Sequence, residues 1–375
     1  MRFIPICLTL ILSFGTAIQE AVYGQQMDFE TYDPKSTLVV PENPLYRAKF
    51  PFVDIHSHQS NVTQERINFL LKEMGELNMA VMVNLSGKSF ARGRSEIDAQ
   101  EYMNSMIRRF NGVAPGRFVV FTNLSFENFG SADWTKKAVA ELETDVRNGA
   151  KGLKIFKNLG LSVRDINGKR VPVDHPHLDP IWAKCGELGI PVLIHSADPA
   201  PFWEPMDSQN ERWLELKIHP GRRRGVDNPA PFEQIIAEQH NVFRKHPRTT
   251  FINAHMGWMA NDLDRASKHL DTYPNVNFGI AAVIAEFGRQ PKRAREFFIK
   301  YQDRLLFGKD SYNKEEFFTY FRVLETEDEY FPYYKKYHAF WRMYGLGLPD
   351  DVLKKVYYKN ALRIIPNMDR SLFPN

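Results

Sequence analysis

Phe52-Val-Asp-Ile-His-Ser-His58 is a short apolar run that leads directly into two histidines, and similar apolar runs recur along the rest of the chain. Seven further short apolar runs follow it, most of them apolar on successive residues rather than on alternate ones. This pattern is typical of strands buried on both faces of a parallel sheet. The seven runs are Met79–Leu85, Phe118–Leu124, Gly152–Phe156, Pro191–Ile194, Thr250–Ala254, Val276–Ala281 and Leu305–Phe307.

Helix-like stretches lie between these runs. Gln64–Leu77, Asp133–Asn148 and Phe232–Lys245 carry apolar residues at helical spacing. The repeated strand and helix units extend over about 260 residues, close to the roughly 250 of a (β/α)₈ barrel. The rival fold, a doubly wound open sheet, usually has a glycine-rich phosphate turn after its first strand, and His56-Ser-His-Gln-Ser60 is not such a turn. We therefore predict an α/β protein with a (β/α)₈ TIM barrel.

Two segments are longer than the connections that the repeated strand and helix units require. Asp198–Pro231 follows the fifth run and is rich in Pro, Trp and Arg, whereas Ser311–Pro349 follows the eighth and is aromatic and charged. Loops after the strands of a barrel lie at its catalytic face, so both segments are candidates to cover an active site. The alternative is that they are surface insertions without a role.

The N-terminus has the pattern of a secretory signal peptide. Arg2 gives it a basic start, Ile4–Phe14 is apolar but shorter than the roughly 20 residues of a membrane span, and small residues follow. We expect cleavage after Gly24 and export to the periplasm or medium. Residues 1–24 are thus predicted as signal peptide, 25–50 as an extended lead-in and 51–375 as the barrel domain. Removal of Cys7 leaves Cys185 as the only thiol, which excludes an intramolecular disulfide.

Composition limits the partners. With 49 basic and 45 acidic residues, the chain carries a net charge of +4, too balanced over 375 residues to indicate nucleic acid. No second apolar run approaches the length of a membrane span. A small-molecule substrate is therefore expected, with self-association left open.

Polar side chains stand at the ends of four of the apolar runs. His56 and His58 end the first, and because alternate residues of a strand face the same way, both imidazoles can reach one metal ion. His195 ends the fifth run, His255 the sixth and Asp310 the eighth, all where a barrel places its chemistry. A second His-x-His pair, at His175 and His177, has no strand before it, and we interpret it as part of a loop.

These pieces together resemble the amidohydrolase superfamily, in particular the branch that includes the aminocarboxymuconate-semialdehyde decarboxylase-like enzymes. The matching segments, in order, are Asp54–His58, Pro191–His195, Phe251–Gly257, Leu306–Asp310 and the C-terminal Val352–Leu362. The resemblance implies a (β/α)₈ metalloenzyme in which His56, His58 and His195 bind metal, Asp310 is the acidic ligand and His255 is a general acid/base. Lys309 departs from the branch, which commonly has a small residue there, and a cation beside Asp310 would lower its basicity.

Three imidazoles and a carboxylate suit one Zn²⁺, although Mn²⁺ or Fe²⁺ fits the same ligands. Zinc can lower the pKa of a bound water to about 7. The leading hypothesis is therefore an exported metal-dependent hydrolase of a small amide, lactone or ester. The alternative is a lyase that decarboxylates or hydrates a small carboxylic acid at the same site. A metal-bearing binding protein without turnover is a third class.

Three further residues are candidates for substrate binding. Lys154, in the fourth run, either binds an anionic group or extends to solvent. The resemblance implies a third role, because in some amidohydrolases a lysine of the fourth strand is carbamylated and bridges two metals. Arg223 lies in the basic run Arg222–Arg224 of the long fifth loop, which is either a carboxylate site or a solvated loop. Trp203 in the same loop forms a wall of the substrate site or packs the loop down.

Overall fold

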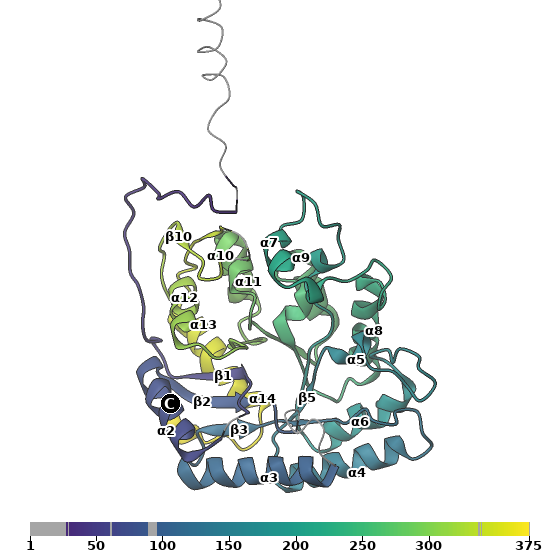
Figure 1. Cartoon of the computed structure of the whole chain (residues 1–375). Coiled ribbons are helices and arrows are strands. Elements are labelled where there is room, and N and C mark those ends of the chain that lie inside the picture. Colours follow the sequence, from purple (N-terminus) through teal and green to yellow (C-terminus); the bar gives the residue numbers. More distant parts are fainter. Residues whose placement is uncertain are drawn as a thin grey trace, which may run out of the picture. The chain divides into compact units, whose positions relative to one another are not determined.

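The computed structural model describes residues 28, 30–60, 62–88, 96–336, 338 and 340–374, without the side chains of residues 96–98. The predicted signal peptide and its cleavage site lie outside the described residues. The chain divides into two units, residues 1–39 and 40–375. In the first unit, the described residues 30–39 form a turn near Thr31 and an exposed stretch. Figure 1 shows the whole chain, in which the labelled helices and strands all belong to the second unit.

Each predicted run forms a strand of a parallel sheet in the second unit. All six residues of β1 and all six of β2 are buried, as expected for strands covered on both faces. The third run is recorded as two pieces on either side of Phe121. The strands are β1 Phe52–Ser57, β2 Met79–Asn84, β3 Phe118–Val120, β4 Thr122–Asn123, β5 Leu153–Ile155, β6 Val192–Ile194, β7 Phe251–Asn253, β8 Val276–Gly279 and β9 Leu305–Leu306.

The strands close into a barrel. Parallel pairing runs from β1 through β2 to β3, and from β4 through successive neighbours to β9. The last strand returns to the first, because the backbone N–H of Ile55 donates to the carbonyl of Phe307 over 3.1 Å and that of Asp310 to the carbonyl of His56 over 2.8 Å. Ser57 and Asp310 also form a parallel bridge. The predicted (β/α)₈ barrel is confirmed, and its closing seam lies between β9 and β1.

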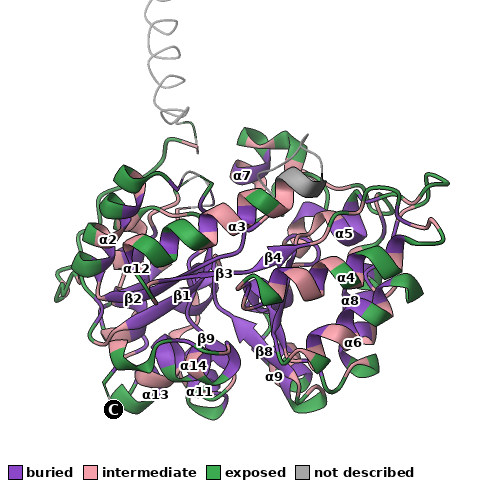
Figure 2. Cartoon of the chain, turned by 90° about the horizontal axis from the view of Figure 1, so that it is seen from below, coloured by how far each residue is buried: buried purple, intermediate pink, exposed green. Residues whose placement is uncertain are grey.

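Helices cover the outside of the barrel. Figure 2 shows the buried strands inside and helices whose outer faces are exposed. The three predicted helices are α2 Gln64–Leu77, α4 Trp134–Arg147 and α8 Phe232–Lys245. The other helices of eight or more residues are α3 Glu96–Val113, α6 Asp179–Glu187, α9 Leu263–Thr272, α11 Pro291–Lys300 and α12 Lys314–Glu325, and the shorter ones are α5 Asn158–Leu161, α7 Trp213–Ile218, α10 Ile284–Arg289, α13 Asp350–Lys354 and α14 Asn360–Ile364.

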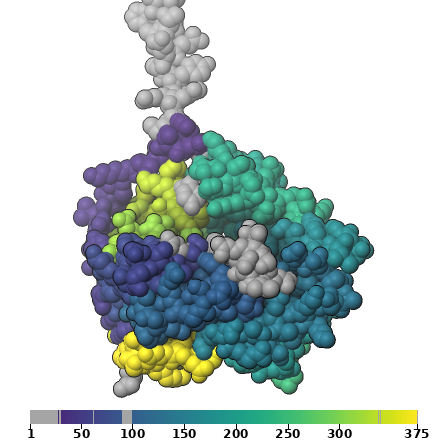
Figure 3. Space-filling view, turned by 60° about the horizontal axis from the view of Figure 1, so that its bottom comes forward, coloured from purple at the N-terminus to yellow at the C-terminus, as the bar shows by residue number. Residues whose placement is uncertain are grey.

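An aromatic cluster fixes the first strand, and with it the His-x-His pair. The ring of Phe52 lies 4.8 Å from Phe307, 5.5 Å from Phe321 and 6.0 Å from Tyr357, measured between centroids. Burial of a side chain this large contributes about 1.5–3 kcal/mol. The C-terminal segment that carries Tyr357 continues to the surface, where Figure 3 shows it in yellow against the blue segment around α3.

The two long segments meet at the end of the molecule where Figure 1 labels α7, α10 and the short strand β10 (Phe331–Pro332). Arg212 of the first segment is buried and donates to Glu286 of α10 over 2.6 Å. The same guanidinium lies 3.0 Å from Nδ1 of His338 in the second segment. Arg212 therefore links the chain after β6, β8 and β9. Within the described residues, no helix is both long and apolar enough to cross a membrane.

Candidate metal centre

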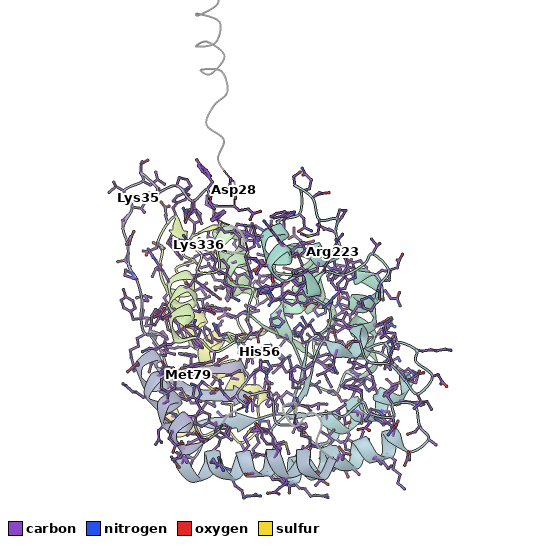
Figure 4. All side chains as sticks on the ribbon, viewed as in Figure 1. Asp28, Lys35, His56, Met79, Arg223 and Lys336 are labelled. Atoms are coloured by element: carbon purple, nitrogen blue, oxygen red, sulfur yellow. The ribbon has the colours of Figure 1, made fainter. Side chains whose placement is uncertain are left out.

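Three of the predicted ligands come together at the seam of the barrel. Nε2 of His56 lies 3.7 Å, and Nε2 of His58 3.6 Å, from Oδ1 of Asp310. The ligand atoms of these three residues all lie within 4.8 Å of one another. In the described part of the chain, these three side chains form a group of His and Asp ligands that could hold a metal ion. Figure 4 shows His56 in the interior, beside the strands.

The two histidines are in the protonation state that metal binding needs. Burial lowers the pKa of His56 well below its usual value and that of His58 to about 4, so both are neutral at pH 7. Their contacts with Asp310 are therefore not ion pairs, and at 3.6–3.7 Å they are too long for hydrogen bonds. Nδ1 of His58 lies 2.7 Å from Oγ of Ser86, which orients the ring and leaves Nε2 for an ion. The donor set thus fits a divalent metal.

His255 faces the same group from the turn that follows β7. Its ring centroid lies 4.9 Å from that of His56 and 4.4 Å from that of His195. Nδ1 is 2.7 Å from the carbonyl of Ala281, and because a carbonyl only accepts, Nδ1 carries the proton. Nε2 is buried and has no hydrogen-bond partner among the described residues. Burial lowers the pKa of His255 to about 4, so a neutral imidazole exchanges protons at Nε2.

The backbone at two of these residues is unusual. His255 has φ 54° and Asp310 has φ 86°, both in the left-handed region that residues other than glycine rarely adopt. Met256 and Gly257 continue the left-handed turn, and the following indole of Trp258 stacks on His255 at 4.7 Å and 21°. Such conformations cluster at functional sites, where the surrounding structure enforces them.

His195 lies beside this group but not within it. Its ring is next to His255 and Trp258, and its Nε2 is buried without a hydrogen-bond partner in the described part of the chain. Its nitrogens are not among the ligand atoms that gather within 4.8 Å. The assignment of His195 as a fourth ligand stays a prediction.

Lys154 is the buried cation of the site. It is 1% exposed, and Nζ has no hydrogen-bond partner among the described residues. Nζ lies 5.3 Å from the ring centroid of Phe156, whose other neighbour is the ring of His58 at 5.5 Å. Burial lowers the pKa of Lys154 to about 7, partly opposed by the negative charge of Asp310. Lys154 does not extend to solvent, which excludes that alternative.

Lys309, the departure from the resemblance, is also buried, but its charge has partners. Nζ donates to the carboxylate of Glu316 in α12 and to the carbonyl of Ser311. Glu316 therefore balances the cation next to Asp310, which weakens the expected effect on the basicity of Asp310.

The remaining candidates lie in the long segment after β6. Trp203 is buried, donates from Nε1 to the carbonyl of Ala230 over 2.9 Å and packs on Phe232. These contacts pack the segment down, as one of the two alternatives predicts. Arg223 is exposed and lies away from His56 in Figure 4. Its two neighbours are paired, Arg222 with Glu215 and Arg224 with Asp198. Substrate contacts of Trp203 and Arg223 stay predictions.

The structure also reveals residues that the sequence analysis did not assign. Asp54 contacts the backbone of both ligand-bearing segments, Ser86 orients His58, and Trp258 stacks on His255. Only Asp54 had a signal in the sequence, since it precedes His56 by two residues and so faces the same side of β1.

Fold and site together define a (β/α)₈ barrel enzyme with a centre for a divalent metal ion. The chain belongs to the amidohydrolase family, because the Amidohydrolase family model matches residues 87–366. This match begins after β1, so the placement of His56 and His58 depends on the structure. A search of curated proteins found no match.

Solved structures share the fold at low sequence identity. A 2,6-dihydroxybenzoate decarboxylase complexed with 2,6-dihydroxybenzoate matches with a TM-score of 0.52 at 16% identity, covering 84% of this chain and 99% of its own. A dihydroxybenzoic acid decarboxylase from Polaromonas sp. JS666, with bound manganese and 2-nitroresorcinol, matches with 0.53 at 14% identity, covering 84% and 96%. A 4-oxalomesaconate hydratase from Rhodopseudomonas palustris matches with 0.51 at 14% identity, covering 86% and 97%. The predicted superfamily and fold are confirmed.

Proposed function

We propose that this enzyme is a lyase that removes CO₂ from a small carboxylic acid without oxidation, at the centre formed by His56, His58 and Asp310. This was the alternative hypothesis of the sequence analysis, and it replaces hydrolysis as the leading one. The reactions named for the similar structures, two decarboxylations and one hydration, support it. We also propose Zn²⁺ as the metal and export as the destination of the chain.

The observation that carries the proposal is the unpartnered ammonium of Lys154. A buried cation without a hydrogen-bonded counter-ion is costly, and no carboxylate of the described residues accepts a hydrogen bond from Nζ, although the charge of Asp310 acts on it from a distance. An anionic substrate would provide the missing partner beside the metal ligands. A carboxylic acid has this charge, whereas a neutral amide, lactone or ester does not.

The residues of the site would have separate roles in this reaction. His56, His58 and Asp310 would hold the divalent ion, which would supply a Lewis acid for an oxygen of the substrate. Nζ of Lys154 orients the carboxylate. The carbon–carbon bond to this carboxylate breaks, CO₂ leaves, and the electron pair stays on the substrate carbon, which then takes a proton. His255 can relay that proton through Nε2: in the neutral ring Nε2 carries no hydrogen because the proton is on Nδ1, so Nε2 first takes a proton from solvent and then passes it to the carbon.

Product analysis tests the proposal. The purified enzyme, loaded with Zn²⁺ or Mn²⁺, is incubated with a panel of hydroxybenzoates and unsaturated carboxylic acids, and with matched lactones and amides. We expect one CO₂ per molecule of acid consumed. Release of a new acid from a lactone or amide, without CO₂, would instead support the hydrolase. Addition of water to an unsaturated acid without CO₂ would make the enzyme a hydratase.

A further inference from the structure

The metal ligands stand on both sides of the seam where the barrel closes. His56 lies in β1 and His58 directly follows it, whereas Asp310 follows β9, the last strand of the barrel. A metal ion can bind all three ligands only if the end of β1 and the segment after β9 are held at the correct separation. The contacts that set this separation in the protein itself are therefore part of the site.

One carboxylate oxygen joins the two segments. Oδ1 of Asp54 accepts the backbone N–H of His56 over 3.0 Å and the backbone N–H of Lys309 over 3.1 Å. One of these residues is a ligand and the other adjoins Asp310. Asp54 is 1% exposed, so water does not compete with these bonds. Its carboxylate is not among the ligand atoms that gather at the centre.

The segments are also close enough to require a glycine between them. A Cβ on Gly308 would lie 3.0 Å from Cβ of His56 and 3.2 Å from Cγ1 of Ile55. Both contacts are tighter than ordinary van der Waals separation, so a methyl group there would require His56 or Ile55 to shift by a few tenths of an ångström. Asp54 therefore holds two segments that Gly308 allows to approach.

We propose that Asp54 is a positioning residue that assembles the metal centre before the ion arrives. It fixes the backbone on each side of the seam, so that the ion orders only side chains. Without Asp54 the ion would also have to order the backbone, and its affinity would fall. This inference rests on the proposed metal centre but goes beyond its ligands.

The test measures Zn²⁺ affinity in the full mature chain after removal of metal, by competition with a chromophoric chelator. In Asp54→Ala we expect the affinity for Zn²⁺ to fall about 10- to 100-fold, the usual cost of losing a residue that orients ligands. In Asp54→Asn the amide oxygen can still accept both N–H groups, so affinity should return to within a few-fold of wild type. Gly308→Ala should weaken Zn²⁺ binding as well.

Asp328 is the matched control. It is 4% exposed and also joins distant segments, accepting the backbone N–H of Asn43 over 2.7 Å, but it is not part of the metal centre. Asp328→Ala should lower the melting temperature of the metal-free protein and leave Zn²⁺ affinity unchanged. If Asp54 were merely structural, Asp54→Ala would behave in the same way.

The possible results distinguish the positioning role of Asp54 from the existence of the metal centre. A wild-type protein that binds no Zn²⁺ and no other divalent ion would remove the proposed centre itself. A wild type that binds Zn²⁺, with unchanged affinity in folded Asp54→Ala, would overturn only the role of Asp54. If Asp54→Ala does not fold, Asp54→Ser and Gly308→Ala decide, and wild-type affinity in both would overturn the inference.

Discussion

His255 is held in place by three features that act on one ring. Its Nδ1 donates to Ala281, Trp258 stacks on its face, and its backbone is left-handed. The substitution His255→Asn keeps a polar side chain but removes the imidazole. We expect metal content to be retained and turnover to fall roughly 10²- to 10⁴-fold, the usual contribution of a general acid/base. Zinc content, melting temperature and turnover should be measured on one sample.

Other roles for His255 give different results in that experiment. A ligand would lose metal on substitution, and a structural histidine would lose thermal stability with near-normal turnover. The pH profile adds a second criterion. Burial lowers the pKa of His255 to about 4, so the limb of the profile that changes should lie near pH 4 rather than near the unperturbed 6.5.

Lys154 makes substrate affinity depend on pH. Its pKa is lowered to about 7, so its charge is present below pH 7 and lost above it. We therefore expect KM for a carboxylic acid to rise as pH increases from 7 to 9. Lys154→Met should remove this dependence and raise KM about 10- to 100-fold, since a hydrogen bond to a charged group contributes about 1.5–3 kcal/mol.

Lys151 provides the control for that substitution. It precedes the same strand, at the end remote from the metal ligands, and Lys151→Met should leave KM and its pH dependence unchanged. An equal KM in wild type and Lys154→Met would refute the assignment of Lys154 to the substrate carboxylate. Two metal ions per chain in wild type, falling to one in Lys154→Met, would instead support the carbamylated bridge.

At the scale of elements, α8 and α9 pack through a pair of histidines. The rings of His240 and His269 lie 4.6 Å apart, and His269 is 3% exposed with no hydrogen-bond partner in the described part of the chain for either nitrogen. Burial lowers the pKa of His269 to about 2. Between pH 2 and 6.5 the unfolded chain therefore binds the proton and the folded one does not, so stability rises with pH over this range.

This pairing predicts an acid-sensitive contact between the two helices. From pH 7 to pH 5, His269 alone should cost about 2 kcal/mol of the free energy of unfolding. In His269→Phe the loss of stability over that interval should be smaller by this amount. The measurement is urea unfolding at both pH values, with the exposed His177→Phe as control. An unchanged difference between the two pH values in His269→Phe would refute the prediction.

The sequence predicts those elements whose environment is uniform along their length. Strands β1 and β2 are buried on both faces, so their apolar runs mark them directly. Helix α2 has apolar residues on one side and an N-cap at Thr63, and both ends were predicted correctly. Helix α3 was not predicted, although Met103, Met106 and Phe110 stand at helical spacing and are buried.

The site is predictable only in part, for a physical reason. Strand ends of a barrel converge, so His56, His58 and Asp310 could be placed together from their positions alone. The contacts of Ser86 and Trp258 depend on how loops and turns pack, which no local pattern encodes. Whether the side chain of His195 reaches the metal ion also depends on how loops and turns pack.

At the scale of the whole molecule, the predicted export of the chain is independent of the metal centre. If residues 1–24 form a signal peptide, the mature protein should begin near Gln25 and be recovered from the periplasm or medium. N-terminal sequencing of the purified native protein checks this. Soluble cytoplasmic protein that still begins at Met1 would contradict export.

Elemental analysis of the purified protein shows whether the seam of the barrel holds a divalent metal. The wild type should contain about one tightly bound divalent ion per chain. The double variant His56→Ala/His58→Ala should contain none, because removal of two of the gathered ligands leaves too few to hold the ion. Unchanged metal content in a folded double variant would place the metal at another site and exclude a metal centre at the seam.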